Sequence, residues 1–213
     1  MPSRREKLTT GSYYHIFNRS VEGITVFSSK SDYFRFISSV CFCSGFKGSF
    51  SFYFNGPYSD KSIYAAIGFS KMCSKNLRVD EKVKVIAYCI MPNHYHLLLS
   101  QSRDYGISDF TKSIQLGYSK YLNIRRQRFG ALWCGAFKSI HVKDEEQLFK
   151  VSRYIHRNPA VSSKVSVSLQ NLEDYKYSSY REYIGLDPYG ICDPDEIIKG
   201  NFTPKEYRKF VTI

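Results

Sequence analysis

The sequence has no apolar run that approaches the ~20 residues of a membrane-spanning helix, and its first residues, MPSRREK, lack the apolar stretch of a secretory signal. We therefore expect no membrane partner. Acidic residues are also scarce: 19 Asp and Glu stand against 31 Lys and Arg, which leaves a net charge of +12. Nucleic acid is the commonest large polyanion in a cell, so this excess predicts a nucleic-acid partner and a cytoplasmic, nucleoid-associated protein.

None of the six cysteines belongs to a Cys-x-x-Cys pair, so a zinc ribbon or a thioredoxin-like motif is unsupported. We expect reduced thiols that serve as small apolar side chains. Tryptophan occurs once, but 18 Tyr and 16 Phe raise the aromatic fraction to 16%. The hydrophobic fraction of 43% excludes wholesale disorder and indicates a folded, basic, aromatic-rich protein.

Hydrophobic periodicity predicts the element order β-α-β-β-α-β with one further helix, and the corresponding ranges are 12–19, 29–43, 83–90, 94–100, 107–126, 133–142 and 145–158. Ser29 and Asp32 have the spacing of a helix cap, and Pro159 is expected to end the last helix. The order is typical of an α+β, ferredoxin-like fold, in which two helices lie on one face of an antiparallel sheet. The stretch 45–82 has no clear period and is interpreted as an insertion, with a short helix expected near 65–73.

His94 and His96 form the first candidate site. Side chains at positions i and i+2 of a strand point to the same face, so the two imidazoles are expected to project together at a separation suited to one metal ion. A coincidental pair of structural histidines explains the spacing equally well. His15, on the first predicted strand, could line the same face, although a structural role is the more common one.

Tyr154 and Asn158 form the second candidate. Residues at i and i+4 stack on one helix face, so a phenol and an amide oxygen would face the same surface. With 18 tyrosines in the chain, a tyrosine on an amphipathic helix usually belongs to the core. His156, two residues from Tyr154, is expected on a different face of the helix.

Basic residues concentrate on the second long helix and on the last one. We expect them to bind DNA, although a solvated charged face is the alternative. The residues concerned are Lys112, Lys120, Arg125, Arg126, Arg128, Arg153 and Arg157.

The run AYCIMPNHYHL, residues 87–97, resembles the signature of the single-tyrosine HUH transposases, where HUH denotes His, a hydrophobic residue and His. Four further segments follow in the order of that family: GYSKYLN at 117–123, GAFK at 135–138, RYIHRNP at 153–159 and YSSYREY at 177–183. Together they are most similar to the REP-associated tyrosine transposases, which resemble the transposases of bacterial insertion sequences that move as single strands. The resemblance covers residues 11–185 apart from 45–82.

The resemblance implies a metal-dependent enzyme that cuts and rejoins single-stranded or hairpin DNA. His94 and His96 would bind Mg²⁺ or Mn²⁺ with Asn158 as third ligand, whereas the imidazole pair alone would suit zinc equally well. Tyr154 would be the nucleophile and form a 5′-phosphotyrosine link. The catalytic domain would span 1–160 and end in an extra catalytic helix, with a C-terminal extension, 161–213, packed on it. Relatives include monomers and dimers that exchange tyrosine helices, so a homodimer is possible.

Two other functions fit parts of the pattern. A ferredoxin-like sheet with exposed aromatics also describes non-catalytic RNA-recognition domains, but their Lys/Arg-Gly-Phe/Tyr-Gly/Ala-Phe fingerprint is absent from this sequence. A replication initiator or relaxase is a neighbouring enzyme class, which often has a different order of motifs. Because the family includes domesticated members, an intact site does not by itself establish transposition.

Overall fold

A computed structural model describes residues 7–45, 80–186 and 190–213 of the chain. Its strands are β1 (Tyr13–Arg19), β2 (Val83–Met91), β3 (His94–Gln101) and β4 (Lys138–Val142). Its helices are α1 (Lys30–Gly45), α4 (Gly106–Arg125), α5 (Glu145–Val161), α6 (Tyr180–Tyr183), α7 (Asp195–Ile198) and α8 (Pro204–Thr212), and two 3₁₀ turns are η1 (Val21–Gly23) and η3 (Leu169–Asp174). The predicted insertion at 45–82 and its helix near 65–73 lie almost entirely outside the described residues.

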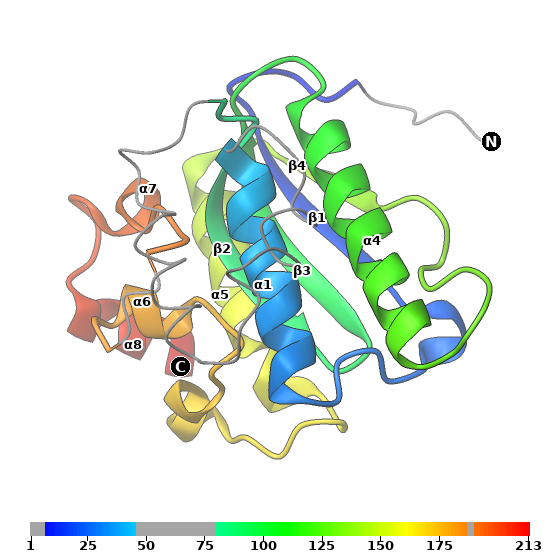
Figure 1. Ribbon diagram of the computed structural model, residues 1–213. Helices are drawn as coiled ribbons and strands as arrows, with labels where there is room; N and C mark the ends of the chain where they lie inside the picture. Colours follow the sequence, from blue (N-terminus) through cyan, green and yellow to red (C-terminus); the bar gives the residue numbers. More distant parts are fainter. Residues whose placement is uncertain (1–6, 46–79, 187–189) are drawn as a thin grey trace.

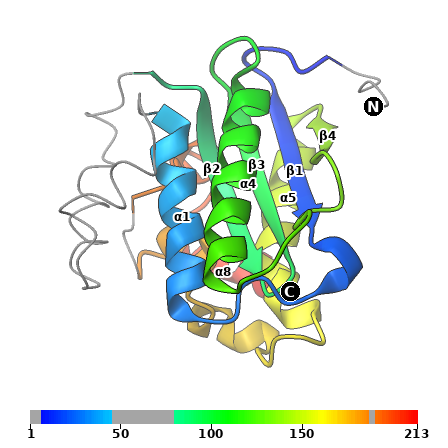
Figure 2. The ribbon, with the colours of Figure 1, turned by 45° about the vertical axis from the view of Figure 1, so that its right-hand side comes forward.

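The four strands form one antiparallel sheet in the order β2-β3-β1-β4. Helices α1 and α4 pack against each other over one face, and α5 lies behind the other (Figures 1 and 2). This order and layering confirm the predicted α+β, ferredoxin-like architecture. Within the part of the chain that the structure describes, no helix combines the length and apolar character that crossing a bilayer requires.

Both faces of the β2–β3 hairpin are buried, which explains why these strands read as nearly continuous apolar runs. Tyr95, Leu97 and Leu99 belong to the core shared with α1 and α4, whereas Leu98 belongs to the core on the α5 side. Because side chains alternate along a strand, His94 and His96 face α5. The sheet therefore carries the histidine pair toward the helix that bears Tyr154.

Local sequence signals set most helix ends. Asp32 accepts a hydrogen bond from the Ser29 backbone N–H (3.1 Å), and Ser29 Oγ accepts one from the Asp32 N–H (3.3 Å), so the predicted cap of α1 is confirmed. The prediction that Pro159 ends the last helix is wrong, because α5 continues to Val161. Proline can adopt helical φ, and its missing N–H costs one hydrogen bond in a turn that ends two residues later.

The C-terminal segments pack on the side of the sheet that carries α5. His156 is fully buried, its Nδ1 lies 2.8 Å from the Tyr207 hydroxyl of α8, and its Nε2 lies 2.8 Å from Ser179 Oγ. This network links α5 to the end of the chain and confirms that His156 points away from the face of Tyr154. The domain division at residue 160 stays a prediction.

Four described cysteines, Cys43, Cys89, Cys134 and Cys192, are free thiols as expected. Cys41 is disulfide-bonded, so the expectation of reduced thiols fails at that position. It lies buried in the C-terminal half of α1.

Candidate active site

The histidine pair lies on β3, directly after the turn that closes the β2–β3 hairpin. The His94 and His96 ring centroids are 5.1 Å apart, and the two rings are nearly perpendicular. His96 is buried and His94 is partly buried. The strand thus presents two imidazoles side by side on the α5 face, as the His-x-His spacing predicts.

Helix α5 brings Tyr154 and Asn158 to the same place. Asn158 Oδ1 lies 3.2 Å from His94 Nε2, and the Tyr154 ring meets the His96 ring edge-on at a centroid distance of 5.5 Å. Tyr154 is 51% exposed, whereas Asn158 is buried. One turn of helix therefore separates a solvent-accessible phenol from a buried amide oxygen, and all four predicted residues meet within one chain.

Each histidine is held from behind through Nδ1. His94 Nδ1 lies 2.7 Å from Asn93 Oδ1, and His96 Nδ1 lies 2.9 Å from His15 Nε2 on the neighbouring strand. Asn93 is itself oriented, because its Nδ2 donates to the carbonyl oxygen of Gly23 (3.2 Å). Both rings are thereby turned so that Nε2 is the nitrogen left for the site.

The hydrogen-bond partners of His94 indicate whether this group of residues can bind a cation. A neutral imidazole has one N–H, yet His94 faces amide oxygens at both nitrogens, Asn93 Oδ1 and Asn158 Oδ1. With the proton on Nδ1, the Nε2 lone pair and Asn158 Oδ1 face each other with no hydrogen between them. Two neighbouring ligands of an octahedral ion with bonds of about 2.1 Å lie about 3 Å apart, which matches this pair. The donor set therefore fits a divalent metal.

Burial keeps the imidazoles neutral, as metal ligands must be. It lowers the pKa of His94, with a smaller contribution from the positive charges of Arg19 and Lys164 and an opposing one from the contact with Asn158. It also lowers the pKa of His96 well below its ordinary value and that of His15 to about 4. Within the described residues, no three His, Cys, Asp or Glu side chains form a metal-binding group. The Asn158 amide oxygen lies 3.2 Å from His94 Nε2 and is the third donor that the sequence predicts.

A cavity of about 470 Å³ opens beside the histidine pair. Three cationic side chains line it, Arg19 at the end of β1, Lys138 at the start of β4 and Lys164 after α5. The sequence reasoning missed these three residues. Alternation along β1 could have indicated Arg19, which shares a strand face with His15, whereas nothing local to the sequence places Lys164 here.

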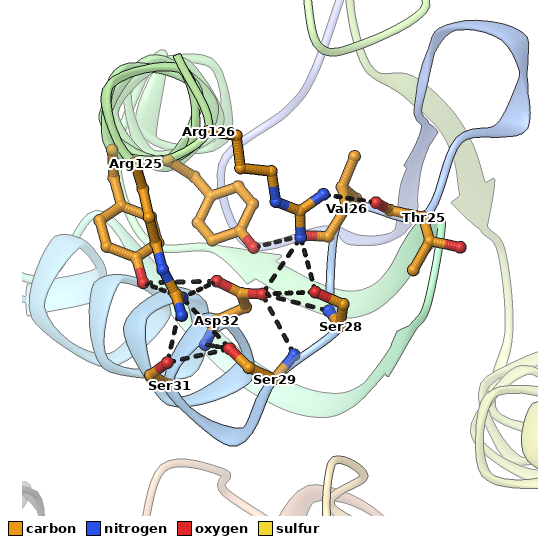
Figure 3. Close-up of polar contacts among 10 residues, drawn as sticks. Thr25, Val26, Ser28, Ser29, Ser31, Asp32, Arg125 and Arg126 are labelled. Atoms are coloured by element: carbon orange, nitrogen blue, oxygen red, sulfur yellow. Dashed lines mark hydrogen bonds and ion pairs between the residues drawn. The ribbon is translucent and has the colours of Figure 1, made fainter. Parts of the chain in front are cut away.

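The basic residues predicted on α4 lie elsewhere. Helix α4 covers the sheet face opposite to α5 (Figure 1), and its last residues are tied to the start of α1. Arg125 and Arg126 both form ion pairs with the carboxylate of Asp32, which is 1% exposed (Figure 3). Arg126 also donates to the Thr25 carbonyl oxygen, and Arg125 to Ser31 Oγ. The two arginines hold α1 and α4 together on that face.

The other predicted basic residues are scattered. Lys112 and Lys120 are exposed on α4, and Arg128 donates to Asn123 Oδ1 just beyond it. On α5, Arg153 lies over the Phe210 ring at 5.2 Å, toward α8. Arg157 is half-buried, one turn from Tyr154. Only Arg157 therefore shares the neighbourhood of the tyrosine, and DNA contact by all seven stays a prediction.

Three comparisons relate the chain to known proteins. Residues 67–158, which include β2 to β4 and most of α5, match the family model described as "Transposase IS200 like". A Haemophilus influenzae protein named as a REP-associated tyrosine transposase is 26% identical over 132 residues, covering 55% of this chain and 72% of the relative. A solved structure of a REP-associated tyrosine transposase bound to a REP hairpin has a TM-score of 0.52 and 14% identity, and the match covers 89% of this chain and 90% of that chain.

The structural match supports the fold alone, because a sequence identity of 14% is too low to support a shared function. The family model spans both His94 and Asn158, so the matched segment contains the whole candidate constellation. The resemblance found in the sequence is thereby confirmed: the chain is similar to the IS200-like transposases and to the REP-associated tyrosine transposases, and this similarity supports a DNA transposase enzyme.

Proposed function

We propose that this protein is a transposase of the REP-associated type, a metal-dependent endonuclease and strand transferase that cuts single-stranded DNA beside a folded hairpin and uses Tyr154 as its nucleophile. The observation that carries the proposal is the position of Tyr154. Its ring is half exposed and in edge contact with the ring of His96 in the same chain. A nucleophile for a bulky DNA strand must be reachable from solvent and must lie next to the groups that bind the phosphate.

The reaction is an in-line displacement at phosphorus. The Tyr154 hydroxyl loses its proton and its oxygen bonds to the scissile phosphorus, while the bond to the 3′ oxygen breaks and that oxygen leaves as a protonated 3′-OH. The DNA is then held through a 5′-phosphotyrosine ester. Because the phosphodiester energy is kept in that ester, a second 3′-OH can attack it and rejoin the strand without a nucleotide cofactor.

His94, His96 and the Asn158 amide oxygen hold the metal. When bound, a divalent cation supplies charge stabilisation at the phosphate oxygens and helps a phenol that is mostly protonated at neutral pH. The resemblance to the family favours Mg²⁺ or Mn²⁺, whereas two imidazoles and an amide would also accept zinc. The contacts at Nδ1 of both rings fix the direction of the ligand lone pairs in advance.

The cavity beside the histidines receives the DNA. Arg19, Lys138 and Lys164 place three positive charges around it, and Arg157 lies one turn from Tyr154. Phosphates on either side of the cut would meet these cations. Hairpin DNA is the proposed substrate because the structural relative is bound to a REP hairpin. Tyr154 reaches the histidines of its own chain, so a homodimer is not needed to complete the site and stays a prediction.

A covalent trap tests the proposal. We expect the protein, incubated with Mn²⁺ and a labelled oligonucleotide that carries a hairpin and a single-stranded flank, to form an adduct that survives denaturing electrophoresis. Tyr154→Phe should abolish the adduct, because it removes only the attacking oxygen. Tyr105→Phe is the matched control: Tyr105 is 66% exposed but lies at the start of α4, and its replacement should leave the adduct unchanged.

The same experiment separates the alternatives. An undiminished adduct in Tyr154→Phe would overturn the assignment of the nucleophile. Binding of the hairpin that is insensitive to EDTA, with no cleavage or adduct from any substrate, would favour a domesticated or non-catalytic binding module.

A further inference from the structure

Either ring could donate the proton in the contact between His15 and His96, and the two choices have different consequences for His96. His15 lies on β1 and His96 on β3, where the register pairs His96 with Phe17, so the two histidines are diagonal neighbours across the strands. His15 Nε2 lies 2.9 Å from His96 Nδ1, and both side chains are 6% exposed. A hydrogen bond between two buried imidazoles requires one defined arrangement of protons.

Only one such arrangement leaves His96 able to bind a cation. If His15 Nε2–H donates, His96 Nδ1 is the acceptor and the ring proton of neutral His96 sits on Nε2, where it blocks the ligand lone pair. If His96 Nδ1–H donates, His15 Nε2 is the acceptor and His96 Nε2 is free. In the second arrangement His15 carries its own proton on Nδ1.

We propose that His15 is a positioning residue that accepts a hydrogen bond from His96 Nδ1–H and so fixes His96 in the tautomer whose Nε2 faces the metal. The inference rests on the metal site of the proposed function. It is supported by the parallel at His94, where Asn93 Oδ1, which can only accept, lies at Nδ1 and at a shorter distance than Asn158 Oδ1 lies at Nε2 (2.7 Å against 3.2 Å). Two different side chains thus present acceptors to the Nδ1 atoms of the two ligands.

Outer partners of this kind typically contribute 10–100-fold to metal affinity. In His15→Phe the ring is kept and the acceptor is lost, so the dissociation constant for Mn²⁺, measured on the DNA-free protein by electron paramagnetic resonance, should rise by about 10–100-fold. In His15→Gln the side-chain amide reaches about as far as Nε2 and offers an acceptor, so most of the affinity should return. His141→Gln is the matched control, because His141 pairs with Tyr14 on the other sheet face and its replacement should change nothing.

The second measurement reads the tautomer without metal or DNA. Long-range ¹H–¹⁵N spectra of the wild-type protein at neutral pH should show His96 as the Nδ1–H form and His15 as the Nδ1–H form. The His96 signals should move toward the Nε2–H form in His15→Phe and stay in place in His15→Gln. If His15→Phe fails to fold, the wild-type spectrum alone decides between the two proton arrangements.

Wild-type His96 in the Nε2–H form, or an unchanged Mn²⁺ affinity in folded His15→Phe, would overturn the inference. Failure of the proposed function looks different. A wild-type protein that forms no covalent adduct, but whose Mn²⁺ affinity depends on His15, retains the positioning role and loses the nuclease assignment. A wild-type protein that forms the adduct, but whose Mn²⁺ affinity does not depend on His15, retains the nuclease assignment and loses the positioning role of His15.

Discussion

The residues of the site differ in how much of their chemistry is local. Tyr154 and Asn158 lie one helical turn apart, and their burial differs: Asn158 is buried beside His94 of β3, whereas Tyr154 is half exposed to solvent. Helical spacing predicts that they share a surface. It does not predict that the amide of the proposed ligand is buried against His94 and that the phenol of the proposed nucleophile is half exposed.

At this scale we expect Asn158→Ala to weaken Mn²⁺ binding by about tenfold or more, because it removes an oxygen from the first coordination sphere and leaves two imidazoles. Asn158→Asp should retain or strengthen binding, because a carboxylate is a better ligand for a hard cation. Titration of the DNA-free protein with Mn²⁺ measures both. Asn123→Ala on α4, whose amide donates to the Gly130 carbonyl oxygen, is the control, and equal affinities in all three variants would exclude Asn158 as a ligand.

At the scale of elements, the Asp32 cluster determines how α1 and α4 pack. The buried carboxylate accepts hydrogen bonds from the backbone N–H groups of Ser28 and Ser29, and it forms ion pairs with both Arg125 and Arg126. Burial alone would raise the pKa of Asp32, but these hydrogen bonds and the Arg125 charge together hold it below its ordinary value. The same carboxylate therefore caps one helix and anchors the end of another (Figure 3).

We expect Asp32→Asn to lower the free energy of unfolding by about 2 kcal/mol, because a buried charge-assisted network loses its acceptor charge. Since the pKa of Asp32 is depressed in the folded state, its contribution is present at neutral pH and is lost as the pH falls below the ordinary carboxyl value. Urea unfolding at pH 7 and pH 3 should show the variant and the wild type converging at the lower pH.

The matched control for Asp32 is Asp109→Asn. Asp109 of α4 pairs at 3.1 Å with Arg103, which precedes that helix, but both side chains are about half exposed, so the change should be below ~0.5 kcal/mol. Equal losses in the two variants would show that burial of Asp32 contributes nothing to the strength of its network.

At the scale of the whole molecule, the cations that give the net charge of +12 include two groups with different surroundings. Part of the positive charge is tied up between α1 and α4, and part lines the cavity next to the histidines. The sheet separates these two groups. In the proposed mechanism, DNA at Tyr154 would lie closer to the second group than to the first. We therefore expect the salt dependence of DNA binding to come mainly from the cations on the α5 side of the sheet.

Binding of the hairpin oligonucleotide should weaken with salt, and log affinity plotted against log salt concentration gives a negative slope. We expect the double variant Lys138→Gln/Lys164→Gln to reduce the magnitude of this slope by up to about 1.4, since each lost phosphate contact on a single strand reduces it by about 0.7. Lys112→Gln/Lys120→Gln, which removes the same charge from the opposite face, should have a smaller effect. A fluorescence titration at several NaCl concentrations measures both slopes. A greater loss from the α4 pair would place the DNA path on the other side of the sheet.

The elements of the fold could largely be predicted because their signals are local. Aromatic and β-branched content identifies β1, and short apolar runs on either side of a turn identify β2 and β3. The Ser29–Asp32 pair identifies the start of α1, and helical periodicity identifies α4 and α5. The end of α5 was mispredicted, because proline in a last helical turn costs little and packing outweighs it there. Which sheet face each helix covers follows from chain connectivity in three dimensions.

The sequence by itself determined the chemistry available to this protein: two imidazoles on one strand face, a phenol and an amide on one helix face, and an excess of positive charge. These depend on spacings of two and four residues, which backbone geometry converts directly into shared faces. Tertiary structure alone decided that Asn158 meets His94, that His15 on another strand supports His96, and that Arg125 and Arg126 bind Asp32 instead of facing the tyrosine. Such pairs join residues far apart in the chain, and only the packing of the sheet between its helices brings them within hydrogen-bonding distance.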